Sequence, residues 1–200
     1  MFDSAEMYGN ESEVGLAILS FMTGDPYLKR EEFYFTTKLA SNNGYSRSLK
    51  SIEQSLKACG LGYIDLLLIH SPYGGPQARK ESWEALKEAQ RLGWTKSIGV
   101  SNYGVRHLKE MLDQGFKPVI NQVDLHPFMT RNDIVSFCEQ HDIILEVDLF
   151  RSPADIGLRT AYEGISHRSS SFTRNCQKIQ QDPRTDPHSL GTPTWVCRAS

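Results

Sequence analysis

The chain has 200 residues, of which 39% are hydrophobic and 23% charged, and its formal net charge at neutral pH is -2. This composition is typical of a globular protein with one core, and the small charge gives no electrostatic reason to expect nucleic acid or an anionic membrane as a partner. No apolar run approaches the ~18 residues of a membrane span and the first residues do not resemble a signal peptide, so we expect a cytoplasmic protein.

Helices and strands are predicted to alternate along residues 1–147. Residues 2–11 predict a strand end, a loop and a helix start. The order that follows is a helix over 14–22, a strand over 32–39, a helix over 49–59, a strand over 64–70, a helix over 83–90, a strand over 97–100, a helix over 105–114, a strand over 119–125, a helix around 134–138 and a strand from 143. Strand starts recur every ~22 to 33 residues, about the length of a βα unit, so the sequence predicts a parallel α/β fold.

The alternation ends after about residue 147. Residues 151–200 contain polar runs and several proline-containing turns, with few periodic apolar residues. Apolar residues between 156 and 165 are spaced for one short helix, but no partner strand is predicted for it. We therefore predict one domain over residues 1–148 and an irregular, disordered tail over residues 149–200.

Four cysteines are widely separated: Cys59, Cys138, Cys176 and Cys197. They form no C-x-x-C pair, so we expect neither a zinc site nor a disulfide framework. Cys59 and Cys138 fall on apolar helical faces, and both are predicted to be small core residues rather than reactive thiols.

Four residues with useful chemistry lie at or just after predicted strand ends: Asp3, Tyr8, Lys38 and His70. Parallel barrels build their active sites from strand ends and the loops that follow them. Each residue also has a structural interpretation when it is taken alone. Asp3 would be a loop carboxylate and Tyr8 a half-buried aromatic residue, whereas Lys38 would be a solvated strand-end charge and His70 a hydrogen-bonded turn residue.

Five motifs in chain order carry a resemblance to a known family. They are residues 3–11, the lysine at 38 that ends a Phe-Thr-Thr strand, Ile-Asp-Leu-Leu-Leu-Ile-His at 64–70, Gly-Val-Ser-Asn at 99–102 and Asn-Gln-Val-Asp-Leu-His-Pro at 121–127. Over residues 1–146 the chain thereby resembles the aldo-keto reductases. The resemblance implies a (β/α)8 TIM-type barrel that binds NADPH and reduces a small aldehyde or ketone to an alcohol by hydride transfer.

The resemblance also implies roles for the four strand-end residues. Tyr8 is the proton donor to the carbonyl oxygen, and His70 binds and orients the substrate carbonyl. An unperturbed phenol has a pKa of about 10, which is too high for ready donation at neutral pH. The ammonium of Lys38 favours the phenolate and so lowers that pKa, and Asp3 holds the lysine by an ion pair.

Cofactor binding is implied for four residues. Ser101, Asn102 and Gln122 match positions that bind the nicotinamide carboxamide in this family, and Asp3 is grouped with them. Amide and hydroxyl groups suit this task because they orient the ring without adding charge. By itself, the Ser101-Asn102 pair would be a helix cap or a turn. No metal ligands are expected.

Further residues near these motifs have less specific assignments. His126 matches the family pattern, but we assign it a structural role. Tyr103, Phe128 and the loop at 73–76 are candidates to line a substrate pocket. The sequence does not identify the substrate, because loops largely decide specificity in such barrels.

The resemblance is incomplete at both ends. Members of this family place a further strand and helix before the Asp3 motif. After the position of Glu146 they continue with an aromatic residue that stacks on the nicotinamide, a last βα unit and a basic segment for the adenosine 2′-phosphate. We therefore expect an incomplete barrel with unpaired edges, marginal as a monomer. The abrupt change at Glu146 is what a shifted reading frame or an alternative exon produces. The alternative to a working reductase is a catalytically impaired barrel fragment or a non-catalytic reductase-like protein.

Overall fold

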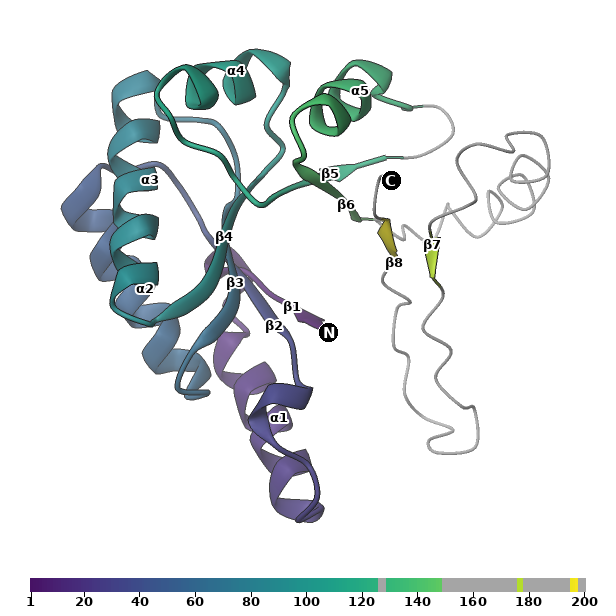
Figure 1. Cartoon of the computed structure of the whole chain (residues 1–200). Helices are drawn as coiled ribbons and strands as arrows, with labels where there is room; N and C mark the ends of the chain where they lie inside the picture. The colour runs from purple at the N-terminus through teal and green to yellow at the C-terminus, as the bar shows by residue number, and fades with distance from the viewer. Residues whose placement is uncertain (126–128, 149–175, 178–194, 198–200) are drawn as a thin grey trace. The chain divides into compact units, whose positions relative to one another are not determined.

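The computed structural model describes residues 1–125, 129–148, 176–177 and 195–197 (Figure 1). The chain divides into two compact units, Met1–Asn121 and Gln122–Ser200. The predicted boundary between residues 148 and 149 stays a prediction, because most of the residues after it lie outside the described ranges. Among the described residues, no helix has both the length and the apolar character that a membrane crossing requires.

Strands and helices alternate throughout the first unit. Its elements are β1 (Phe2–Asp3), the 3-10 turn η1 (Glu6–Tyr8), α1 (Glu11–Gly24), the 3-10 turn η2 (Arg30–Glu32), β2 (Phe35–Leu39), α2 (Tyr45–Cys59), β3 (Ile64–Ile69), α3 (Pro76–Arg91), β4 (Thr95–Ser101) and α4 (Val105–Asp113). Strands β1 to β4 pair in parallel in chain order, with Lys38 opposite Leu68 and Leu68 opposite Gly99. The predicted alternation of parallel strands and helices is thereby confirmed for this unit.

The core of the first unit lies between its sheet and helices. Every residue of β2 and β3 is buried, as expected for strands covered on both faces. Figure 1 shows α2 and α3 side by side along the sheet. Their buried residues include Ile52, Trp83 and Cys59, so the predicted core role of Cys59 is confirmed. Burial also raises the pKa of the Cys59 thiol.

Helix α1 buries a different stripe from the one predicted by apolar spacing. In the helix predicted over residues 14–22, Phe21 lies at apolar helical spacing from Val14 and Ile18, but the structure leaves its side chain 62% exposed. The buried residues of α1 are Glu11, Gly15 and Ile18. A Cβ atom at Gly15 would lie only 1.8 Å from the carbonyl oxygen of Cys59, so the absent side chain permits close contact between α1 and α2. Hydrophobicity alone does not detect a stripe that contains a carboxylate and a glycine.

Several element starts also differ from the predictions, including that of α2, which begins at Tyr45 rather than at residue 49. Strand β2 begins at Phe35 rather than at residue 32, because Arg30–Glu32 form the turn η2. Helix α3 begins at Pro76 rather than near residue 83. Proline is favoured in the first turn of a helix, where its missing N–H has no helical partner to lose. The polar first turns of α3 carry little apolar periodicity, which is why the prediction began too late.

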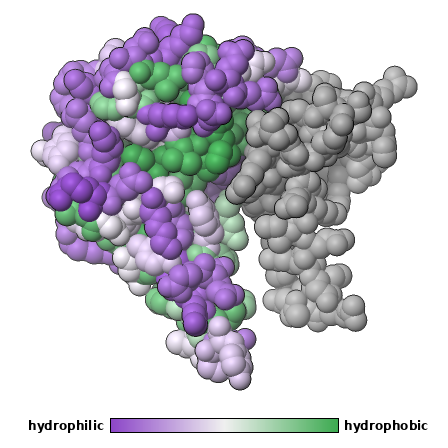
Figure 2. Space-filling view, in the orientation of Figure 1, coloured by the Kyte–Doolittle hydropathy of each residue, from purple (hydrophilic) through white to green (hydrophobic). Residues whose placement is uncertain are grey.

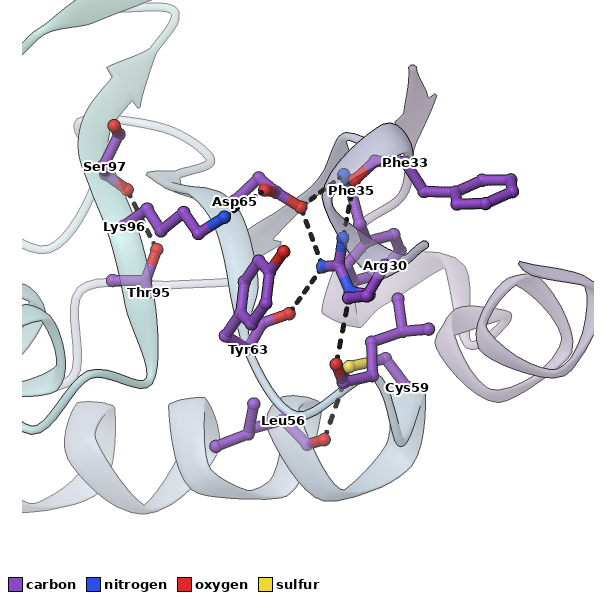
Figure 3. Close-up of polar contacts among 11 residues, drawn as sticks. Arg30, Phe33, Phe35, Leu56, Cys59, Tyr63, Asp65, Thr95, Lys96 and Ser97 are labelled. Atoms are coloured by element: carbon purple, nitrogen blue, oxygen red, sulfur yellow. Dashed lines mark hydrogen bonds and ion pairs between the residues drawn. The ribbon is translucent and has the colours of Figure 1, made fainter. Parts of the chain in front are cut away.

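A charged cluster joins the amino ends of β2, β3 and β4 (Figure 3). The Arg30 guanidinium donates to three backbone carbonyls and lies 2.7 Å from the Asp65 carboxylate, which also accepts the Phe35 N–H. Lys96 lies 3.5 Å from the other Asp65 oxygen. Arg30 Cζ and Lys96 Nζ lie 4.0 and 3.9 Å from the centroid of the Tyr63 ring, within the range of a cation–π interaction. The buried pair of Arg30 and Asp65 at this end of the strands serves the stability of the sheet.

The second unit contains fewer described elements. Strand β5 (Ile120–Asp124) begins in the first unit, and the second unit holds the rest of it with α5 (Asn132–Gln140), β6 (Ile144–Asp148), β7 (Cys176–Gln177) and β8 (Trp195–Cys197). The strand order is β5-β6-β8-β7, and β8 is antiparallel to both β6 and β7. Cys138 is buried on α5, which confirms its predicted core role. Strands β7 and β8 are too short for periodicity to predict, and the helix predicted at 156–165 lies outside the described residues.

Candidate active site

The ammonium group of Lys38 lies at the centre of the candidate site. Lys38 lies on strand β2, and its side chain is only 1% exposed. Its Nζ lies 2.6 Å from Asp3 Oδ1 on the neighbouring β1 and donates to the carbonyl oxygen of Ser4 at 3.1 Å. A buried charge is tolerated only when it is paired and hydrogen-bonded, and both partners are supplied here. The parallel register of β1 and β2 therefore brings together two residues that are 35 positions apart.

Tyr8 lies beside this ion pair. Its ring centroid is 5.3 Å from Lys38 Nζ and 5.7 Å from the centroid of the His70 ring, which it meets edge-on at 86°. The side chain is 48% exposed, so it is accessible from solvent. The structure thus brings Asp3, Tyr8, Lys38 and His70 together at the carboxyl ends of β1, β2 and β3.

Two glutamates hold the segment that presents Tyr8. Glu6 accepts hydrogen bonds from the Ala40 N–H at 2.9 Å and from the Ser51 hydroxyl at 2.5 Å, so η1 is attached to the end of β2 and to α2. Glu11 is buried at the start of α1 and accepts the hydroxyl of Thr37. Neither glutamate was predicted from the sequence, because a carboxylate in a polar stretch carries no local sign of a partner more than 20 positions away.

His70 follows β3 and is half-buried. The backbone N–H of His70 donates to the carbonyl oxygen of Leu39 at 3.0 Å. Burial lowers the pKa of its imidazole below the usual 6.5, the charge of Lys38 lowers it further, and Asp3 opposes the shift. The lowered pKa favours the neutral imidazole. Its Nδ1 is buried and has no hydrogen-bond partner among the described residues. A neutral imidazole can donate from one nitrogen and accept at the other.

Ser101 and Asn102 lie at the end of β4, next to His70. The Asn102 side-chain amide donates to the carbonyl oxygen of His70 at 3.2 Å and to the Ser101 hydroxyl at 3.1 Å. Asn102 has a φ of 61°, a left-handed conformation that asparagine tolerates better than most residues. This pair supplies neutral donors and acceptors at the end of β4, in contact with the backbone of His70. A carboxamide group fits such a lining, because it needs hydrogen bonds and carries no charge.

Gln122 belongs to the second unit, where β5 buries it. Its side-chain amide donates to Glu146 Oε1 on β6 at 3.1 Å. Glu146 is itself buried, and nothing in the sequence indicated a role for it beyond the point where the family resemblance ends. His126 and Phe128 lie outside the described residues. In the first unit Tyr103 is buried, and its backbone N–H and carbonyl both bond to the side chain of Asn121.

The site in the first unit combines four chemical functions. A phenol can donate a proton, a buried ammonium can stabilise the resulting phenolate, a carboxylate holds that ammonium, and a neutral imidazole can hydrogen-bond a polar substrate group. Among the described residues, no group of three or more histidine, cysteine or acidic side chains is placed to hold a metal ion. The arrangement suits proton transfer to an uncharged oxygen.

Known proteins share both the sequence and the fold of this chain. It is 50% identical over 145 residues to an oxidoreductase of Schizosaccharomyces pombe described as uncharacterized, a match that covers 72% of this chain and 51% of the relative. A second such oxidoreductase of this yeast is 40% identical over 232 aligned positions, covering 98% of this chain and 84% of the relative. The crystal structure of a Bombyx mori aldo-keto reductase in complex with NADP matches with a TM-score of 0.68 and 31% identity, covering 72% of this chain and 50% of that one.

These comparisons agree on the family. The chain spans about half the length of the first relative and of the silkworm enzyme, whereas the second yeast relative is matched beyond residue 148. The α/β fold is part of the family's barrel, as we predicted. Residues 1–148 match the model of the aldo/keto reductase family. The chain therefore belongs to the aldo/keto reductase family of oxidoreductases.

Proposed function

We propose that this chain catalyses the NADPH-dependent reduction of an aldehyde or ketone to an alcohol, with Tyr8 as the proton donor. The observation that carries the proposal is the convergence of Tyr8, His70 and the Lys38–Asp3 ion pair at the carboxyl ends of neighbouring strands. Family membership supports it, as does the solved relative that is bound to NADP.

Each residue has a separate task in this reaction. The hydroxyl of Tyr8 gives its proton to the carbonyl oxygen, and the nearby Lys38 ammonium stabilises the phenolate that remains. Asp3 keeps Lys38 in place through the 2.6 Å contact. The neutral imidazole of His70 donates a hydrogen bond to the carbonyl oxygen and orients it toward Tyr8.

NADPH, when bound, supplies the hydride to the carbonyl carbon. Ser101 and Asn102 would hold its carboxamide, since their hydroxyl and amide groups lie beside His70 and are already held in place by hydrogen bonds. Gln122 is the third proposed carboxamide contact, and Asp3 is the fourth proposed cofactor-binding residue. Neutral groups at this point fix the ring without competing with the Lys38–Asp3 pair.

A second candidate function is a non-catalytic reductase-like protein or a catalytically impaired part of a barrel. It is favoured by the coverage of relatives, because the chain spans about half the length of several of them. The two candidates differ in a measurable way. A working reductase consumes NADPH and forms one alcohol per cofactor, whereas a non-catalytic protein does neither.

The test uses the purified full chain, NADPH and a panel of reactive aldehydes. We expect loss of the NADPH absorbance with equal formation of alcohol, and transfer of deuterium from C4-labelled NADPH to the product carbon. Tyr8→Phe should lower the rate by about 10²–10⁴-fold, the usual contribution of a general acid. Tyr27→Phe makes the same change at a tyrosine that is 86% exposed and should keep the full rate. No turnover above the Tyr8→Phe variant would refute the proposal.

A further inference from the structure

The loop after β3 has an unusual pattern of hydrogen bonds. Its four consecutive carbonyl oxygens, from His70 to Tyr73, each accept a hydrogen bond from a side chain. The donors are Asn102 to His70 at 3.2 Å, Asn42 to Ser71 at 2.8 Å, Arg79 to Pro72 at 2.8 Å and Asn42 to Tyr73 at 2.6 Å. Side chains from three different parts of the first unit thereby hold the segment that begins with His70.

Asn42 makes two of these four bonds. It lies just after β2, and only 5% of it is exposed. The Nδ2 atom of an asparagine carries two hydrogens, so one amide can hold two carbonyls of a tight loop. The loop also packs directly against this residue. A Cβ atom at Gly74, where φ is +112°, would lie 2.8 Å from the carbonyl oxygen of Asn42.

Arg79 makes the third bond from a fixed position on α3. Its guanidinium forms a two-point ion pair with Glu110 of α4, with distances of 2.9 and 2.6 Å. The remaining nitrogen Nη1 donates to the carbonyl oxygen of Pro72. Planar two-point pairs between arginine and a carboxylate are the most directional of protein ion pairs, so the third nitrogen is held in a defined direction.

Backbone bonds flank this loop at both ends. The His70 N–H donates to Leu39 O, and the Arg79 N–H donates to Gly75 O at the start of α3. Between these two points the four carbonyls bond to side chains. Residues that lie outside β3 and outside the group of four strand-end residues therefore hold the backbone that follows His70.

We propose that Asn42 is a positioning residue for His70, and that Arg79 supports it in the same role. Asn42 holds the loop that follows the imidazole, so that the ring stays beside Lys38 and Tyr8. This inference rests on the proposed function, because it assigns Asn42 to the step in which His70 orients the substrate carbonyl. A purely structural role for Asn42 would change stability and leave the His70 environment unaltered in the folded protein.

The test compares Asn42→Ala with Asn43→Ala, the same change at the exposed neighbouring asparagine. We expect Asn42→Ala to lower kcat/KM for the carbonyl by about 10–100-fold, since a misplacement of about 1 Å near the chemistry costs up to ~100-fold. The affinity for NADPH, measured separately by titration, should change less than twofold. Asn43→Ala should match the wild-type chain in both measurements.

A second readout does not depend on turnover. The His70 ring proton is titrated by NMR, with His70→Gln to assign its signal. In Asn42→Ala the pKa of His70 should rise toward 6.5, because a loosened loop lets the ring move into solvent and away from Lys38. Asn43→Ala should leave this titration unchanged. If the wild-type chain shows no reductase activity, the proposed function fails, and the His70 titration alone decides whether Asn42 positions the ring.

The outcomes separate clearly. A folded Asn42→Ala variant whose kinetics and His70 titration equal those of Asn43→Ala would overturn the inference. If Asn42→Ala does not fold, Arg79→Lys decides in its place with the same two readouts. That change keeps the positive charge but removes the planar pairing with Glu110, so we expect a smaller shift in the same direction.

Discussion

At the scale of single residues, one buried cation affects three neighbours. Lys38 binds the carboxylate of Asp3, lies 5.3 Å from the ring centroid of Tyr8 and lowers the pKa of His70. The same charge therefore serves two needs of the proposed reaction. In the proposed reaction it would stabilise the phenolate of Tyr8, and it adds to the larger effect of burial that lowers the pKa of His70.

Lys38→Met should separate these effects. Removing the ammonium takes away one cause of the lowered His70 pKa and leaves the opposing charge of Asp3, so the pKa of His70 should rise in an NMR titration. The reduction rate should fall by about 10²-fold or more, because the phenolate of Tyr8 loses its counter-charge. Lys50→Met, at an exposed position of α2, should change neither quantity. An unaltered His70 titration in Lys38→Met would show that the charge does not act on the imidazole as we describe.

The same pKa has a consequence for stability. Because His70 has a lower pKa in the folded chain than in the unfolded chain, the unfolded chain takes up a proton first as the pH falls below 6.5. The contribution of His70 to the free energy of unfolding should have its full value above about pH 6.5. It should be lost as the pH falls from there through the folded-state pKa. In His70→Gln this part of the pH dependence should be absent, which urea unfolding at several pH values can show.

At the scale of elements, periodicity predicted helices and strands well where apolar residues recur at the spacing of the element. The run that forms β3 is one case. The amphipathic helix α2, which is followed by Gly60 in a left-handed conformation, is another. For α1, periodicity predicted the helix but not the buried stripe, which contains Glu11 and Gly15. Their burial depends on Thr37 and on the backbone of Cys59, which are distant in sequence, so no local pattern reveals it.

Two alanine substitutions in α1 should have different effects for this reason. Glycine to alanine in a helix normally stabilises by about 0.5–1 kcal/mol, because alanine loses less backbone freedom on folding. Gly24→Ala meets no atom within 4 Å and should be neutral or slightly stabilising. At Gly15 the new methyl group would overlap the Cys59 carbonyl, so Gly15→Ala should destabilise by about 3 kcal/mol, the upper part of the range for overpacking. Urea unfolding of the two variants measures the contrast, and equal midpoints would contradict the close packing of α1 on α2.

At the scale of the whole molecule, short motifs predicted the family and the barrel architecture, and the comparisons confirm both. The motifs were sufficient because each one is local and their order along the chain is specific. Apart from Lys38–Asp3, which the family resemblance implied, the long-range ion pairs were not predicted. Arg30–Asp65 and Arg79–Glu110 join residues that are 35 and 31 positions apart, and many other carboxylates in the sequence were equally plausible partners. Only the fold decides which charges meet.

The proposed cofactor makes a prediction about the stability of the full chain. A ligand that binds only the folded state stabilises it by about 2.7 kcal/mol at a concentration of 100 Kd. For a chain of this size we expect Tm to rise by roughly 5–10 °C in saturating NADPH. Tyr8→Phe should keep this shift, because its hydroxyl is proposed to act on the carbonyl rather than on the cofactor. Ser101→Ala should reduce the shift, because it removes a proposed carboxamide contact, whereas Ser46→Ala at an exposed position should not. If NADPH leaves Tm unchanged, the chain does not bind the cofactor in its folded state and the second candidate function gains support.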